Sequence, residues 1–160
     1  MSTATPNPDW SLFDYALQQD IAHSEHLLAA LADERKALEA REYGDIETII
    51  AQKKHWVDQL EANAVQRQHW LTQQGLADDM SALNLVKRQA PAVAARWEAA
   101  ATAWRECQTA NQINEQICRR TRVVVERVLD ILRGQNATSA TYDAKGYSQR
   151  TQSGRTISNA

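Results

Sequence analysis

The residues with the greatest capacity for chemistry in this sequence are two histidines and an aspartate near the N-terminus. His23 and His26 lie one helical turn apart, with Asp20 a turn before them, so a metal site on one helix face is geometrically possible. Two imidazoles and one exposed carboxylate on a single helix lack a fourth ligand and the buried groups that orient ligands. We therefore interpret the histidines as solvated or half-buried side chains and expect no metal and no cofactor.

Motifs that announce an enzyme are missing from the sequence. It has no glycine-rich phosphate loop, no nucleophile elbow and no cluster of ligands at a metal spacing. The paired carboxylates Asp33-Glu34 and Asp78-Asp79 are typical of a solvated helix face and a helix start. We expect a protein that is not an enzyme.

Composition favours helices. The chain has 160 residues, 43% of them hydrophobic, with only 5 Gly and 3 Pro. This length can bury one core, and the scarcity of helix breakers predicts an all-α fold. Cys107 and Cys118 are eleven positions apart in one predicted helix, too far for a disulfide, so we expect reduced thiols.

Charge and hydropathy limit the partners and the location. A net charge of −2 gives no field that gathers nucleic acid or holds the protein on an anionic membrane. The N-terminus lacks the basic start and apolar core of a signal peptide, and no apolar run approaches the roughly 20 residues of a spanning helix. We expect a cytoplasmic protein with no nucleic-acid partner and no membrane insertion.

Apolar periodicity predicts three long helices, at about 10–42, 46–74 and 91–133, and a short helix at 80–89. We expect Ser11 to cap the first helix, and Gly44, Gly75 and Gly134 to break the chain after each long helix. The short turn at Gly44 requires an antiparallel hairpin, which would pack on the long third helix as a three-helix, coiled-coil-like bundle. Residues 1–133 would form this helical body, and 134–160, poor in apolar groups, a flexible tail.

The third long helix carries the most regular pattern, an apolar residue at alternating spacings of four and three from Val93 to Leu132. Its tryptophans have the spacing of core packing. Asn111 and Asn114 interrupt the stripe, either to set the register of the bundle or to mark where its interior opens into a groove. Because this helix is longer than the hairpin, about 20 Å of it should stay uncovered and accept a second copy or a client protein.

The candidate client-binding residues lie on the second half of this helix. They are Asn111, Asn114, Ile117, Thr121, Val124, Val125, Val128 and Leu132.

The sequence resembles the FlgN family of flagellar export chaperones. The resemblance is carried by Leu27-Leu28-x-x-Leu31 with Glu34 and Ala37-Leu38, by Lys53 and Leu60, by Arg67-x-x-x-Leu71-x-x-x-Gly75, by Trp97, by Asn111-x-x-Asn114, and by the tail from Thr141 to Gly146. The asparagine pair followed by a tail tyrosine and glycine is the most specific part of this pattern.

The resemblance implies a cytoplasmic chaperone of flagellar type III secretion that uses neither ATP nor a metal. Such a protein binds the C-terminal ends of the hook-associated proteins FlgK and FlgL, prevents their early assembly and brings them to the export gate protein FlhA. In the tail, it implies that Tyr142 and Gly146 dock to the gate. The alternative from the residues alone is a structural coiled-coil protein that self-associates, as a homodimer, without a client.

Overall fold

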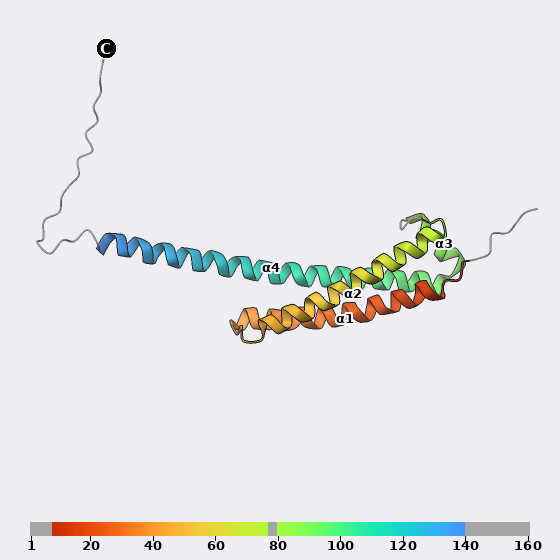
Figure 1. Ribbon diagram of the computed structural model, residues 1–160. Helices are drawn as coiled ribbons and strands as arrows, with labels where there is room; N and C mark the ends of the chain where they lie inside the picture. Colours follow the sequence, from red (N-terminus) through yellow and green to blue (C-terminus); the bar gives the residue numbers. More distant parts are fainter. Residues whose placement is uncertain (1–7, 77–79, 140–160) are drawn as a thin grey trace, which may run out of the picture. The chain divides into compact units, whose positions relative to one another are not determined.

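The computed structural model describes residues 8–76 and 80–139, and within these ranges the chain forms helices and no strand. The helices are α1 (Ser11–Ala40), α2 (Ile46–Gln73), α3 (Met80–Gln89) and α4 (Pro91–Ser139) (Figure 1). The predicted all-α class is confirmed. The chain divides into two units, one that ends at Cys118 and one that begins at Arg119, so helix α4 belongs to both.

Helix α4 continues past the glycine at which we predicted its end. Gly134 lies inside the helix, which runs to Ser139. A lone glycine in a helix costs about 1 kcal/mol relative to alanine, which is too little to end a helix by itself. The prediction of a flexible tail falls, from residue 140 onward, outside the described residues.

The start of α1 is held differently from the prediction. The carboxylate Oδ1 of Asp9 accepts a hydrogen bond from the Ser11 backbone N–H at 3.0 Å, and this bond lowers the pKa of Asp9. Ser11 is therefore the first helical residue and not the cap, because an aspartate two positions earlier takes its amide. Asp14, in the first turn of α1, forms an ion pair at 2.7 Å with Arg96 of α4.

The turn between α1 and α2 is made by a residue other than the predicted glycine. Arg41 adopts the left-handed conformation, with φ of 57°, and the Glu42 N–H donates to the Ala37 carbonyl at 3.0 Å. This is the usual way to close a helix C-terminus, and it leaves Gly44 without a special backbone role. At the end of α2 the prediction is confirmed, because Gly75 has φ of 72°.

The two helices of the hairpin are antiparallel. Asp20, early in α1, pairs with Arg67, late in α2, whereas Glu34, late in α1, pairs with Lys53, early in α2. The order of the contacts is thus reversed along the second helix, as the short turn requires.

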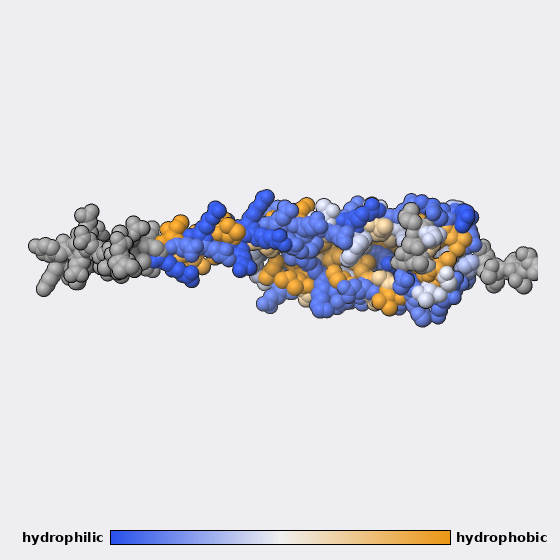
Figure 2. All heavy atoms as spheres, turned by 90° about the horizontal axis from the view of Figure 1, so that it is seen from above, coloured by the Kyte–Doolittle hydropathy of each residue, from blue (hydrophilic) through white to orange (hydrophobic). Residues whose placement is uncertain are grey.

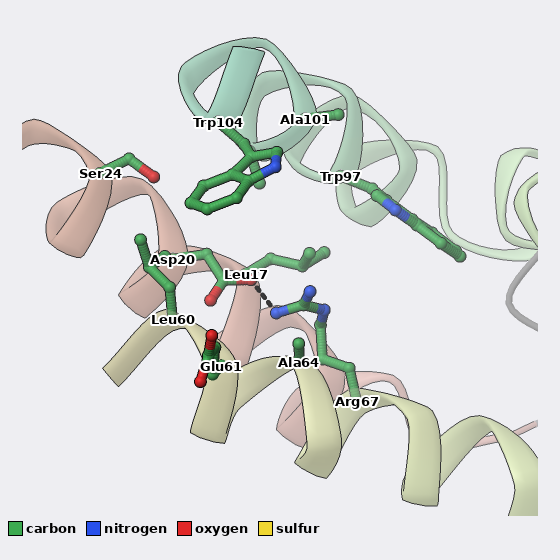
Figure 3. A pocket seen from close by; sticks show the side chains of 11 residues that line it. Leu17, Asp20, Ser24, Leu60, Glu61, Ala64, Arg67, Trp97, Ala101 and Trp104 are labelled. Carbon is green, nitrogen blue, oxygen red and sulfur yellow. Dashed lines mark hydrogen bonds and ion pairs between the residues drawn. The ribbon is translucent and has the colours of Figure 1, made fainter. Parts of the chain in front are cut away.

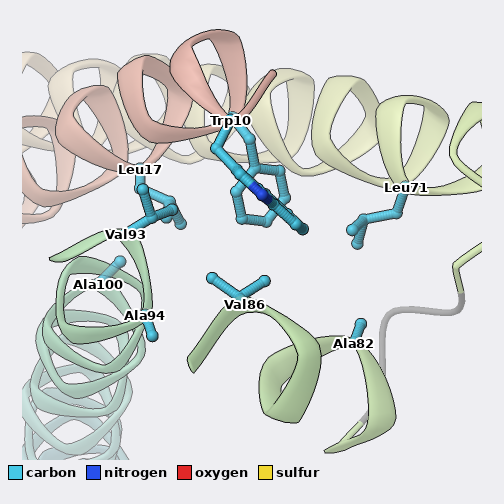
Figure 4. Close-up of a cluster of buried hydrophobic side chains, with 9 residues drawn as sticks. Trp10, Leu17, Leu71, Ala82, Val86, Val93, Ala94 and Ala100 are labelled. Carbon is cyan, nitrogen blue, oxygen red and sulfur yellow. The ribbon is translucent and has the colours of Figure 1, made fainter. Parts of the chain in front are cut away.

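Among the described residues of the first unit, buried apolar side chains form two clusters. One gathers side chains from α1, α2, α3 and the start of α4, which point toward one another in Figure 4. The other cluster joins Leu27 and Leu31 of α1, Leu60 of α2 and Cys107 of α4. The members of the first cluster are Trp10, Phe13, Leu17, Leu71, Ala82, Val86, Val93, Ala94 and Ala100.

Most of the tryptophans pack as the spacing predicted. Trp70 lies 4.9 Å from Trp10 between ring centroids, and Trp97 lies 5.1 Å from Phe13, so both belong to the edge of the first cluster. Trp56 packs on the second cluster. Trp104 differs, because it is 39% exposed.

Candidate functional site

A buried carboxylate joins three helices of the first unit. Glu34 of α1 is only 9% exposed, and both of its oxygens accept hydrogen bonds from the Lys53 ammonium of α2, at 2.9 and 2.8 Å. Oε2 also accepts the Nδ2–H of Asn114 of α4 at 2.7 Å. Burial of a carboxylate is tolerated because a cation and a donor from two other helices meet it. Our interpretation of Glu34 as part of a solvated face is therefore wrong.

Asn114 uses both of its amide hydrogens inside the protein. Besides Glu34, its Nδ2 donates to the Leu31 carbonyl at 2.9 Å, while its Oδ1 accepts from Arg35 Nε at 3.1 Å. The residue is 2% exposed. With no donor left over, Asn114 has the contacts of a residue that sets helix register, one of the two alternatives for the asparagine pair.

Asn111 lies at the edge of the same network. Its Oδ1 accepts from the Lys53 ammonium at 3.3 Å, and its Nδ2 donates to Glu115 one turn further along α4 at 2.9 Å. We call Glu34, Arg35, Lys53, Asn111 and Asn114 the three-helix network. Sequence reasoning identified the asparagines as a functional signal and missed Arg35. It placed Lys53 only in the family pattern, and Glu34 in that pattern and on a solvated helix face.

A second charged group lies further toward the start of α1. Asp20 is 5% exposed, forms an ion pair with Arg67 and accepts a hydrogen bond from Asn63 Nδ2 at 3.1 Å. Burial raises the pKa of Asp20 above its ordinary value, although the nearby guanidinium opposes the shift. Helical spacing indicated Asp20 only as a possible metal ligand, and its role in an interhelical ion pair was missed.

The histidines surround one tryptophan. His26 stacks on Trp56 with centroids 4.4 Å apart, and His23 and His55 contact the same ring at 5.5 and 4.7 Å. Burial is the main cause that lowers the pKa of His23, and electrostatic repulsion from His26 and His55 lowers it further. The negative charge of Asp20 acts in the opposite direction and raises this pKa. Among the side chains that the structure describes, no group of three or more His, Cys, Asp or Glu is placed to hold a metal ion.

A cavity of about 360 Å³ lies between α1, α2 and α4, with the Asp20–Arg67 pair on its wall (Figure 3). Trp97 and Trp104 line the α4 side. The Ser24 hydroxyl also lines it and is buried without a hydrogen-bond partner. The cavity offers no nucleophile activated by a base, so we treat it as a packing gap between the two apolar clusters.

The predicted client-binding residues beyond the asparagine pair fall mainly in the second unit. Ile117, in the first unit, and Thr121 are half-buried. Seven large apolar side chains follow on two turns and a half of helix, and all are between 43% and 59% exposed. They are Val123, Val124, Val125, Val128, Leu129, Ile131 and Leu132.

Most of these apolar residues lie on one face of the helix. At about 100° per residue, Thr121, Val125, Val128 and Leu132 follow the alternation of four and three, and Val124 and Ile131 lie along one edge of that line. We call these six residues the apolar stripe. In Figure 2, hydrophobic surface lies beside strongly hydrophilic surface on the part of α4 next to the grey C-terminal residues. A stripe three residues wide per heptad is typical of a helix that is covered by more than one other helix.

Comparison with known proteins identifies what the chain is similar to. The family model described as FlgN protein matches residues 15–150. A crystal structure from Pseudomonas aeruginosa, of a protein assigned to flagella synthesis as FlgN, is similar with a TM-score of 0.64 and 29% sequence identity. The similarity covers 70% of this chain and 89% of that one. No curated protein matches the sequence.

In the described ranges, none of the helices combines the length and the hydropathy needed to cross a bilayer. The predicted gate-docking residues Tyr142 and Gly146 lie outside the described residues.

Proposed function

The chain belongs to the FlgN family, and from that premise we propose that it is a cytoplasmic export chaperone of the flagellar type III secretion pathway. It binds the C-terminal ends of the hook-associated proteins FlgK and FlgL and prevents their premature assembly. It then delivers them to the export gate protein FlhA.

The observation that carries the proposal is the exposed apolar surface of α4 from Val123 to Leu132. Monomeric proteins rarely expose a contiguous apolar patch of this kind unless it binds another protein. The recognition mode that fits is helix in groove, in which an amphipathic client helix lays its apolar face along the apolar stripe and Ile117. A client end that is disordered when free would fold as it binds.

The three-helix network supports a division of labour along α4. The side chains of Asn114 and Lys53 form hydrogen bonds to other residues of the first unit, so that unit has the contacts of a scaffold. We assign client binding to the helix from Ile117 onward and keep Asn111 and Asn114 as the residues that fix the register before it. Tyr142 and Gly146 are proposed to contact the gate.

Calorimetry with the C-terminal segments of FlgK and FlgL tests the proposal. The full-length protein should bind at least one segment in the micromolar range or tighter. Circular dichroism on the same sample verifies the helical fold. A folded protein that binds neither segment would contradict the proposal.

Self-association through the same stripe is the alternative function. It predicts a tight dimer across a range of concentrations, because the apolar side chains would be buried between copies. Sedimentation at several concentrations distinguishes the two, since a client chaperone must keep this surface available.

A further inference from the structure

The helix segment that carries the apolar stripe has the opposite charge from the chain that precedes it. Residues 119–133 hold five arginines against Glu126 and Asp130, a net charge of +3. Residues 1–118 hold ten basic and seventeen acidic residues, a net charge of −7. The segment with exposed apolar side chains is thus net basic, whereas the chain before it is net acidic.

Two of the arginines border the stripe. Arg120 and Arg127 are seven positions apart, both exposed, and by helical geometry they lie beside the edge formed by Val124 and Ile131. Arg122 is placed differently, because it pairs with Glu126 one turn away at 2.8 Å. The border of the stripe therefore presents a row of positive charge to whatever helix covers it.

We propose that this segment docks an amphipathic helix of a partner protein in which acidic side chains flank the apolar face. The inference rests on the proposed function and names the class of client that the site selects. Apolar side chains would pack on the stripe, and carboxylates of the partner would face Arg120 and Arg127. Complementary charge of this kind favours one register and one orientation and suppresses wrong partners.

Two segments of this chain that could cover the stripe have the wrong charge. The same segment of a second copy also carries +3, so pairing the two stripes brings arginines toward arginines. The C-terminal residues 140–160 hold Lys145, Arg150 and Arg155 against Asp143, a net charge of +2. Neither supplies the carboxylates that the border calls for.

A lipid surface is also a poorer match than a helix. Interfacial helices usually place tryptophan or phenylalanine at the apolar edge, whereas residues 119–139 contain no aromatic side chain. The stripe is rich in β-branched valine and isoleucine at heptad positions, which is typical of helix-to-helix packing.

The test uses the full-length protein and two synthetic helical peptides with the same apolar face, one flanked by glutamates and one by lysines. Fluorescence anisotropy should show the acidic peptide binding at least about tenfold more tightly at low salt, with the preference reduced at high salt. The double variant Arg120→Glu with Arg127→Glu should reverse the preference. The matched control, Arg88→Glu with Arg105→Glu, changes two exposed arginines of the first unit and should keep it.

Several outcomes would overturn the inference. It falls if the acidic peptide does not bind, if both peptides bind equally, or if reversal at Arg120 and Arg127 leaves the preference unchanged. It also falls if sedimentation shows a dimer that Val128→Asp dissolves, or if anionic vesicles of phosphatidylglycerol bind the protein more tightly than the acidic peptide does.

Binding of the FlgK and FlgL segments is measured separately, so that the two proposals can fail independently. If those segments bind and the charge reversal has no effect on the peptides, the inference fails and the proposed function stands. If neither segment binds while the charge reversal acts as expected, the proposed clients are wrong and the preference for an acidic amphipathic helix stands.

Discussion

Asn114 of α4 donates a hydrogen bond to Glu34 of α1 across 2.7 Å, and its second amide hydrogen goes to the Leu31 carbonyl one helical turn away. One side chain thus fixes both the rotation and the height of α4 against α1.

The substitution Asn114→Ala should destabilise the first unit by about 2–3 kcal/mol, because buried hydrogen bonds are lost. It removes the amide donor from the buried Glu34 carboxylate, which keeps Lys53, and from the Leu31 carbonyl, and it leaves Arg35 Nε without this acceptor. Urea unfolding followed by circular dichroism measures the change. Asn111→Ala serves as the control, since Asn111 lies at the partly exposed edge and should cost under about 1 kcal/mol. Equal costs at the two positions would contradict the register role of Asn114.

Removal of the cation from the three-helix network should cost more than removal of the pair. Lys53→Met leaves Glu34, whose side chain is 11% exposed, as an uncompensated buried charge, and a cost of about 3 kcal/mol or more is expected. The double variant Lys53→Met with Glu34→Leu should recover much of that stability. A double-mutant cycle from thermal unfolding gives the coupling, and simple additivity would show that the pair does not interact.

Val128→Asp should weaken client binding at least about tenfold while the melting temperature changes little. Val128 is 49% exposed, so its substitution leaves no cavity in the core. Val86→Asp is the contrasting variant, because Val86 is fully buried and should unfold the protein. Calorimetry and thermal melts on both variants measure the two effects. A large fall in melting temperature for Val128→Asp would mean that the side chain is part of a core.

Stability should fall as the pH drops through the histidine range. Burial lowers the pKa of His23 from its ordinary value of 6.5, so the folded protein binds this proton less readily than the unfolded chain. The contribution of neutral His23 to the stability of the fold is therefore fully present above pH 6.5, and it is lost as the pH falls from there through the lower pKa of the folded state. Melting temperatures at about pH 7.5 and about pH 5.5, above and below the ordinary value of 6.5, measure it. His23→Gln should flatten the difference, and His69→Gln, at an exposed position, should not.

Tyr142→Ala should leave client affinity unchanged and reduce binding to the gate protein FlhA. The expected reason is that the tail and the helix stripe serve different partners. Parallel calorimetric titrations with a client segment and with the soluble part of FlhA compare the two affinities. Equal loss of both would refute the division of roles between Tyr142 and the stripe.

Periodicity predicted the helices well because burial in a helical bundle repeats every three or four residues. The hairpin, the short helix before Pro91 and the break at Gly75 followed from that repeat and from backbone chemistry. The wrong predictions concern the ends of helices, where a neighbouring residue took the predicted role or the helix continued. Asp9 took the amide assigned to Ser11, Arg41 made the left-handed turn instead of Gly44, and Gly134 did not end its helix.

The charged residues of the core could not be assigned from spacing. Glu34 and Lys53 are 19 positions apart and Glu34 and Asn114 are 80 apart, so no local pattern links them. A glutamate is almost always exposed unless it is paired, and a single sequence does not show the pair. The apolar stripe on α4 was easier to predict from the sequence. This segment has more apolar residues than a helix that is mostly surrounded by water would have.

All five tryptophans of the chain lie between Trp10 and Trp104, and none lies on the segment that carries the apolar stripe. Their emission therefore reports on the packing of the first unit and is silent about events at the stripe. A client that binds there without disturbing the bundle would leave the intrinsic fluorescence unchanged, whereas loss of the core would shift it. Intrinsic tryptophan fluorescence can thus distinguish client binding from unfolding in one sample.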